Sequence, residues 1–153
     1  MINQKYLVVF AYLRQNARLK LSKISRKTGI AISTIHDQLK AQKDNLIKKY
    51  TTLLDFEKLG YNAKLSFAIS VSPDDKQKLR DFLLKNHKIN SLYAINNGFD
   101  FLAEGIFKQI REAEQFVEKI EQEFEIKDKE VHYIVDELKQ ETFLSNPYIP
   151  YSS

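Results

Sequence analysis

The pattern of hydrophobic and polar positions divides the chain into a helical first half and a second half in which strands and helices alternate. In the first half, apolar residues recur three and four positions apart, which predicts three helices. The first spans about 3–16, the second begins near Leu21 and the third begins near Ile32. Gly29 lies between the second and third, where a residue in the left-handed conformation commonly ends a helix.

The second and third helices are short and are joined by a tight turn. Leu21 and Ile24 share the inward face of the second helix, and Ile35 and Leu39 share that of the third. Two such helices, with a turn of three or four residues containing glycine, are typical of a helix-turn-helix, whose second helix enters the DNA major groove. The pattern therefore predicts a DNA-binding unit.

The segment after the third helix, residues 47–56 (IKKYTTLLDF), is rich in apolar and β-branched residues and predicts a strand. Lys48 and Lys49 are expected on its exposed side. Basic residues on a strand directly after a recognition helix indicate a wing that contacts the DNA backbone.

The second half predicts a strand over 65–71 and a helix that begins at Ser72-Pro73, since serine and proline favour the first positions of a helix. Two strands follow around Asn97-Gly98, a strong hairpin signal, and then a helix and a last strand. The ranges of these last strands are 91–96, 99–107 and 130–138, and the second helix carries an apolar stripe from Ile110 to Phe124. The order βαββαβ predicts a ferredoxin-like α+β domain with both helices on one face of an antiparallel sheet. We expect phenylalanine, tyrosine and valine side chains on the other face, covered by a twofold copy of the chain.

Four segments follow from this pattern. They are a winged helix-turn-helix domain over 1–57, a hinge over 58–63, a ferredoxin-like domain over 64–141 and a surface tail over 142–153. The ferredoxin-like domain is the expected oligomerisation domain and a candidate effector domain.

Charge separates the two halves in the same place. The net charge of +4 combines 12 basic and 4 acidic residues up to Tyr61 with 12 basic and 16 acidic residues after it. The first half therefore carries a net +8 and suits a polyanion, and the second half carries a net −4. We expect affinity for phosphates to come from the first half and to fall steeply with salt.

The third helix carries the candidate base contacts. Gln38 can form a bidentate bond to adenine, Lys40 can contact guanine or phosphate, and the methyl group of Thr34 can contact thymine. Asp37 is repelled by phosphate and is expected to point aside or to pair with Lys40 or a neighbour. Alternatively, these polar side chains only solvate a helix. The full set of candidate DNA contacts is Lys20, Lys23, Arg26, Lys27, Ser33, Thr34, His36, Gln38, Lys40, Lys48 and Lys49.

Other classes of function have little support. There is no cysteine, and the three histidines lack metal-ligand spacing. No phosphate-binding glycine loop, nucleophile elbow or Ser/His/Asp set is present, so we expect neither an enzyme nor a cofactor. The apolar run 6–13 suits an amphipathic helix better than a signal peptide, and no segment has the length to span a bilayer. A cytoplasmic, nucleoid-associated protein is expected.

One alternative is RNA binding. Asn97-Gly98-Phe99-Asp100-Phe101-Leu102 loosely matches the strand signature of RNA-recognition motifs, in which aromatic side chains stack on bases. The negative charge of the second half opposes this interpretation, and subunit-interface or core packing of Phe99 and Phe101 explains them better.

Taken together, these features resemble the Lrp/AsnC family of transcriptional regulators. The similar stretches are NARLKLSKISRKTGI, ISTIHDQLK, IKKYTTLLDFEKLGY and NNGFDFL, and the resemblance extends over nearly the whole chain. It implies a DNA-binding regulator that dimerises through its second domain and assembles further into tetramers or octamers. It also implies a candidate amino-acid effector site, matched here by Asn97, Gly98, Phe99 and Asp100. The open alternatives are that the second domain serves assembly alone, or that ligand sensing is the primary role.

Overall fold

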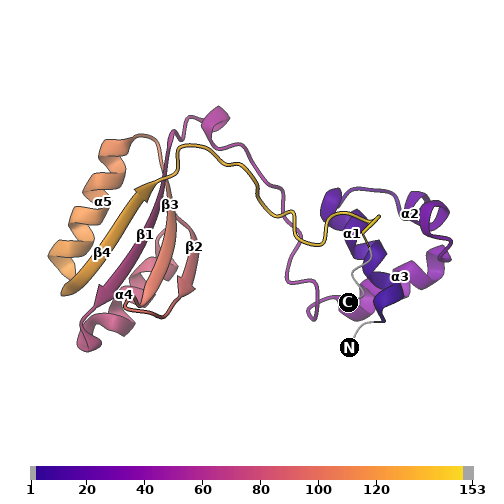
Figure 1. Ribbon diagram of the computed structural model, residues 1–153, viewed down its shortest axis with the longest axis horizontal. Helices are drawn as coiled ribbons and strands as arrows, with labels where there is room; N and C mark the ends of the chain where they lie inside the picture. The colour runs from indigo at the N-terminus through magenta and orange to yellow at the C-terminus, as the bar shows by residue number, and fades with distance from the viewer. Residues whose placement is uncertain (1–2, 150–153) are drawn as a thin grey trace. The chain divides into compact units, whose positions relative to one another are not determined.

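The computed structural model describes residues 3–149, and the chain forms two compact units (Figure 1). The first unit contains Met1–Leu53 together with the C-terminal segment Leu138–Ser153, and the second unit contains Leu54–Glu137. The chain therefore leaves the first unit once and returns to it at its end.

The first unit is built from three α-helices that follow a short 3-10 helix. In order they are η1 (Gln4–Tyr6), α1 (Leu7–Gln15), α2 (Leu21–Thr28) and α3 (Ile32–Gln42). Their shared core consists of Val9, Tyr12, Ile24 and Ile35, each at most 5% exposed. The predicted helix-turn-helix is confirmed.

The strand predicted over 47–56 is not formed in the part of the chain that the structure describes. The segment contains only an isolated parallel bridge between Lys43 and Ile47, next to a left-handed residue at Asp44 (φ 61°). β-branched composition alone does not make a strand, because each backbone N–H and C=O needs a partner. A second 3-10 helix, η2 (Glu57–Leu59), ends at Gly60 (φ 86°), inside the predicted hinge.

The second unit is the predicted ferredoxin-like α+β domain. Its elements are β1 (Ala63–Val71), α4 (Pro73–Lys85), β2 (Ile89–Ala94), β3 (Phe101–Phe107), α5 (Ile110–Glu123) and β4 (Ile126–Tyr133). The sheet is antiparallel throughout, with the order β2-β3-β1-β4. Ser72 and Pro73 begin α4 as predicted.

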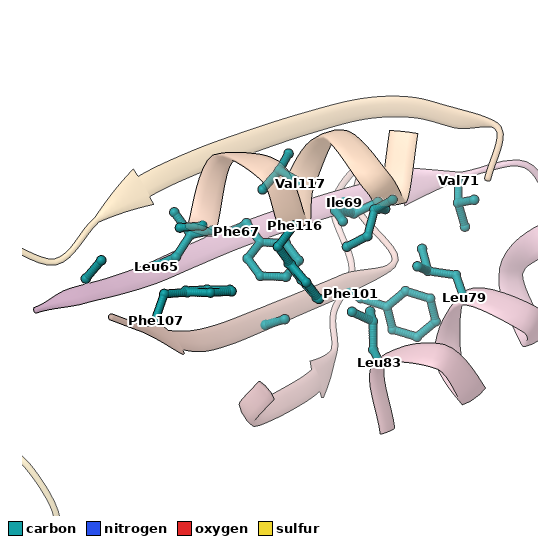
Figure 2. Packing of buried hydrophobic residues seen from close by; sticks show 14 residues of the cluster. Leu65, Phe67, Ile69, Val71, Leu79, Leu83, Phe101, Phe107, Phe116 and Val117 are labelled. Carbon is teal, nitrogen blue, oxygen red and sulfur yellow. The ribbon is translucent and has the colours of Figure 1, made fainter. Parts of the chain in front are cut away.

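The core of this unit lies between the sheet and both helices. Figure 2 shows Phe116 and Val117 of α5, with Leu79 and Leu83 of α4, pointing toward the apolar face of the sheet. The Phe116 ring lies 6.1 Å from that of Phe67 and 5.4 Å from that of Phe107, measured between centroids. Burying each large apolar side chain stabilises the fold by roughly 1.5–3 kcal/mol.

The last strand differs from its predicted range. It begins at Ile126 rather than near 130 and ends at Tyr133 rather than near 138. Residues 126–129 (IKDK) lack apolar alternation, and their pairing is set by β1, where Lys129 faces Ile69 and the register shifts between Ser70 and Val71. Backbone pairing with a neighbour outweighs side-chain pattern at such an edge.

The hairpin turn is as predicted, although its strands end sooner. Asn97 (φ 66°) and Gly98 (φ 96°) both have the positive φ that a type I′ turn requires. Ile95 N–H donates to the carbonyl oxygen of Asp100 at 3.0 Å, which closes the turn. The strands themselves end at Ala94 and resume at Phe101.

The sheet face opposite the helices is mixed rather than apolar. The phenylalanine and valine side chains that we expected there, such as those of Phe67 and Phe101, lie in the core. The opposite face, defined by the alternate positions, carries Lys64, Ser66, Ala68, Ser70, Ser91, Tyr93, Leu102, Glu104, Ile106, Asp128, Glu130 and His132. Strand registry, which the sequence did not reveal, determines which residues of each strand face the helices.

Candidate nucleic-acid interface

The turn between α2 and α3 positions the third helix. Gly29 adopts the left-handed conformation (φ 72°), and its N–H donates to the carbonyl of Ser25 at 2.8 Å. The hydroxyl of Thr28 donates to the carbonyl of Ile24 at 2.8 Å and accepts from the N–H of Ile30 at 3.3 Å. Ile35 then packs against Ile24 in the core. This geometry buries one face of α3 and leaves the other to solvent.

The outward face of α3 presents polar and cationic side chains. Ser33, His36 and Lys40 are exposed, and they recur at helical spacing. Thr34 and Gln38 are half-buried beside the inward residues, so they lie at the edge of this face rather than at its centre. Gln38 therefore reaches outward less freely than the sequence suggested.

Two further residues belong to this face and were missed. Lys43 follows Lys40 by three positions, is exposed and caps the C-terminal end of α3. Ile32 begins the helix and remains 46% exposed, which places an apolar side chain where a thymine methyl group can be contacted. Extending the helical spacing from His36 and Lys40 by one more step would have found Lys43.

Asp37 is exposed between His36 and Gln38. An ion pair with Lys40 or a neighbour, one of the expected alternatives, is not among the ion pairs of residues 3–149. A carboxylate on a recognition helix can instead accept a hydrogen bond from the amino group of cytosine.

The bases of α2 and of its N-cap form a second cationic surface. Lys20, Lys23 and Arg26 are exposed, and within the described chain none of them is in an ion pair. Lys27 is also exposed, and its ammonium lies 5.9 Å from the centroid of the Tyr12 ring, a cation–π geometry. Unpaired cations in a row are suited to phosphate contact.

Lys48 and Lys49 are exposed in the extended segment after α3. Because no strand forms there in the described residues, no sheet fixes their direction. Their assignment as backbone contacts stays a prediction.

The four candidate effector residues lie together at the β2–β3 turn, with Asn97 and Gly98 exposed and Phe99 half-buried. The Asp100 carboxylate is already engaged: it accepts from the Val71 N–H at 3.0 Å and lies 2.7 Å from the Lys76 ammonium. The hydrogen bonds from Lys76 and from the Val71 N–H lower the pKa of Asp100 below its ordinary value of 3.8. Asp100 thus joins the end of β1 to the first turn of α4.

The RNA-binding alternative is not supported by the position of Phe101. Its side chain is 4% exposed and lies in the core, so it cannot stack on a base. Phe99 lies in the turn rather than on the strand. The competing interpretation of Phe101, as core packing, is confirmed.

Among residues 3–149, no group of three or more His, Cys, Asp or Glu side chains is placed to hold a metal ion. In the same part of the chain, no helix combines the length and apolar character needed to cross a membrane.

Solved structures share this architecture. AsnC of E. coli superposes with a TM-score of 0.80 at 17% identity, covering 92% of this chain and 96% of that one. LrpC of B. subtilis gives 0.78 at 17% identity, covering 91% and 97%. A transcriptional regulator of Neisseria meningitidis, solved in complex with L-Met, gives 0.82 at 18% identity, covering 92% and 94%.

The resemblance to Lrp/AsnC regulators is confirmed. The chain has the Lrp/AsnC fold, in which a helix-turn-helix unit is joined to a ferredoxin-like domain. Among curated proteins it is similar to the HTH-type transcriptional regulator FL11 of Pyrococcus furiosus, with 27% identity over 113 residues, 73% of this chain and 75% of the relative. The FL11 protein of Pyrococcus horikoshii matches over the same share at 27% identity. No family model matches the chain.

Proposed function

We propose that this chain is a sequence-specific, DNA-binding transcriptional regulator of the Lrp/AsnC type. The observation that carries the proposal is the outward face of α3, where exposed Ser33, His36 and Lys40 lie on a helix-turn-helix beside the unpaired bases of α2. The role is one of binding rather than catalysis, like that of the transcriptional regulators the chain resembles.

In this proposal, α3 enters the major groove and α2 lies across the phosphate backbone. Lys40 contacts guanine or phosphate, and Ser33 and His36 reach base edges. Thr34 and Gln38 contact the DNA from the edge of the outward face of α3. Lys20, Lys23 and Arg26 neutralise phosphates, which sets the register without carrying sequence information.

In this proposal the chain dimerises through its second unit, so that one dimer presents two α3 helices to the DNA. Two α3 helices would read half-sites about 34 Å apart, one helical turn of DNA. The sheet face opposite the helices supports this role, since it exposes Tyr93 (58%) beside half-buried Leu102 and carries half-buried Ile106 farther along β3. Further assembly into tetramers or octamers, and association with the nucleoid, belong to the same proposal. Promoter DNA would be occupied or bent, with repression or activation as the outcome.

Selection of bound sequences from randomised DNA tests base readout. We expect Lys40→Ala to weaken binding and to relax preference at one position of the site, by about 1–3 kcal/mol of discrimination. Gln38→Ala should have a smaller effect because its side chain is half-buried. Lys85→Ala is the matched control, since Lys85 is an exposed lysine of the second unit. A Lys40→Ala protein that selects the same sequences with the same affinity would remove α3 as the reader.

The paired change Lys48→Ala with Lys49→Ala tests the segment after α3. We expect weaker binding to every sequence and a lower salt slope, by about 1 for each phosphate that is no longer neutralised. If both affinity and slope are intact, these lysines do not bind the DNA backbone.

Amino-acid sensing is the second candidate, favoured by the likeness to the Neisseria regulator that was solved with L-Met. A thermal-shift screen with the twenty amino acids distinguishes the two roles, because a ligand that binds the native state raises the melting temperature. A rise with one amino acid that is absent in Asp100→Asn would place sensing at the β2–β3 turn. No rise with any amino acid would leave the second unit with assembly alone.

A further inference from the structure

The C-terminal segment contacts the first helix of the DNA-binding unit. After β4 the chain returns to the first unit, and residues 138–149 run beside α1 (Figure 1, yellow). Two residues of α1, Tyr12 and Arg14, bind this segment through their side chains. They are separated from their partners by more than 120 positions in the sequence.

Arg14 holds the segment through its guanidinium group. Nε donates to the carbonyl oxygen of Phe143 at 2.6 Å, and Nη2 donates to the carbonyl and carboxylate oxygens of Glu141 at 3.0 and 3.1 Å. The side chains of Arg14 and Glu141 are 37% and 59% exposed, so their charge attraction alone contributes little. The rigid fork of donors, which engages two main-chain carbonyls at once, is what fixes the segment.

Tyr148 makes the second contact, with its ring edge-on to that of Tyr12 (6.5 Å between centroids, 80° between planes). Tyr12 is 5% exposed and also belongs to the core with Ile24 and Ile35. Burial raises the pKa of the Tyr12 phenol, and a hydrogen bond with Tyr148 raises it further. One tyrosine therefore joins the core of the unit to its C-terminal segment.

Burial along α1 indicates that both sides of this helix are covered. Val9, Phe10, Ala11 and Tyr12 are consecutive, and each is at most 6% exposed. Consecutive residues of an α-helix lie about 100° apart, so four in a row face all sides. Val9 and Tyr12 pack into the core with α2 and α3, whereas Phe10 and Ala11 are buried outside that cluster. Packing against α2 and α3 accounts for one side only.

We propose that the outer face of α1 is a docking surface whose occupant is the chain's own C-terminal segment, residues 141–149, which acts as a strap that completes the DNA-binding unit. The strap lies within the first unit, where it holds the end of the chain against α1. This proposal is independent of which sequence the recognition helix reads.

Hydrogen exchange of the full-length protein tests the strap. Ending the chain after Gln140 should speed amide exchange in α1 by about tenfold or more, because the shortened chain lacks several hydrogen bonds and the edge-on contact of Tyr148 with Tyr12. Exchange in α5, in the core of the second unit, should not change. Unchanged exchange in α1 would overturn the proposal.

Point variants keep the test decisive if the shortened chain does not fold. Arg14→Lys retains the charge but removes the fork, and Tyr148→Ala removes the ring that packs on Tyr12, so each should speed exchange in α1 by several-fold. Phe143→Ala is the matched control: its side chain is 83% exposed, and only its main-chain oxygen binds Arg14. Equal effects of all three variants, or no effect of any, would contradict the roles assigned to Arg14 and Tyr148.

Cross-linking establishes whether the strap acts within one chain. The protein has no cysteine, so Gln15→Cys combined with Phe143→Cys introduces a single pair of thiols, one on α1 and one on the segment. A short bis-maleimide should join them within one chain and leave a monomer on a denaturing gel. A product of twice the mass that requires both substitutions would show that a second copy supplies the strap, and absence of either product would show that the segment does not dock.

Discussion

Basic side chains have different surroundings in the two units. In the second unit, several lysines lie against acids: Lys76 is 2.7 Å from Asp100 and Lys64 is 2.8 Å from Glu137, and Lys88 pairs with Glu112. In the first unit, the bases of α2 and of the outward face of α3 are exposed and, in the described chain, have no ion pair. Arg14 of α1 is the exception in this unit, because it pairs with Glu141 of the strap.

We call the bases that pair with acids within the fold structural charge, and the unpaired bases that are available to phosphate binding charge. A lysine paired with a carboxylate of its own unit adds little net charge, so it releases few counterions from DNA. An unpaired lysine on a surface poor in acids keeps its full attraction for phosphate. The number of bases does not distinguish the halves in this respect, because each contains 12. The distribution of acids does.

Phe67→Ala should have the largest effect, and it tests whether the two units also have separate cores. Phe67 is 1% exposed in the second core, so its loss should lower the free energy of unfolding by about 3–5 kcal/mol. Urea unfolding measures the loss of stability, and hydrogen exchange shows which elements lose protection. Leu84→Ala, at a side chain that is 56% exposed, is the control. Equal loss of protection in α2 and α3 would mean that the units unfold as one.

Neutralising the unpaired bases should have the next largest effect. Combined alanine substitution of Lys20, Lys23 and Arg26 should lower the slope of log K against log salt by about 2.7 if each contacts one phosphate. The matched control replaces Lys78, Lys119 and Lys127, which pair with acids of the second unit. Filter binding over a range of salt concentrations measures both. Similar slopes for the two triple variants would remove the distinction between structural and binding charge.

Gly105→Ala tests how tightly the second core is packed. A Cβ at this position would lie 2.6 Å from a ring carbon of Phe107, which is fully buried. Such overpacking should cost about 1–3 kcal/mol of stability, measured by thermal or urea unfolding. Phe107→Leu in the same chain should recover part of the loss. An unchanged stability would show that the ring has room to move.

Asp100→Asn should have the smallest effect, and it depends on pH. The folded pKa of Asp100 lies below its ordinary value of 3.8, so its contribution to stability is present above that value and is lost as pH falls through the folded pKa. Wild-type stability should therefore fall more steeply than that of Asp100→Asn below about pH 4. Asp74→Asn, at an exposed acid in the first turn of α4, is the control. Parallel stability curves for wild type and Asp100→Asn would show that its contacts with Lys76 and Val71 do not stabilise the fold.

Local chemistry explains which elements were predictable. The helix-turn-helix followed from Gly29 and the spacing of Ile24, Ile35 and Leu39, and each of these signals lies within a few residues of the turn it produces. The Asn97-Gly98 turn was predictable for the same reason. The wing strand was not formed, because 47–56 has strand-like composition but no pairing partner within the described chain.

The candidate site was predictable to the same extent. Helical spacing identifies Ser33, His36 and Lys40 as one face, and a longer stripe would have included Lys43. The half-burial of Gln38 was not predictable, since it depends on how closely α3 packs on its neighbours.

The sequence by itself determined the helix periodicity, the glycine turn, the βαββαβ order and the division of charge, because all of these depend on neighbouring residues. Only the tertiary structure decided the pairing of the charged 126–129 segment with β1, the mixed opposite face of the sheet, the engagement of Asp100 and the return of the C-terminal segment to α1. These features join residues that are far apart in the chain. Their energies arise from backbone pairing, packing and charge interactions that exist only once the chain has folded.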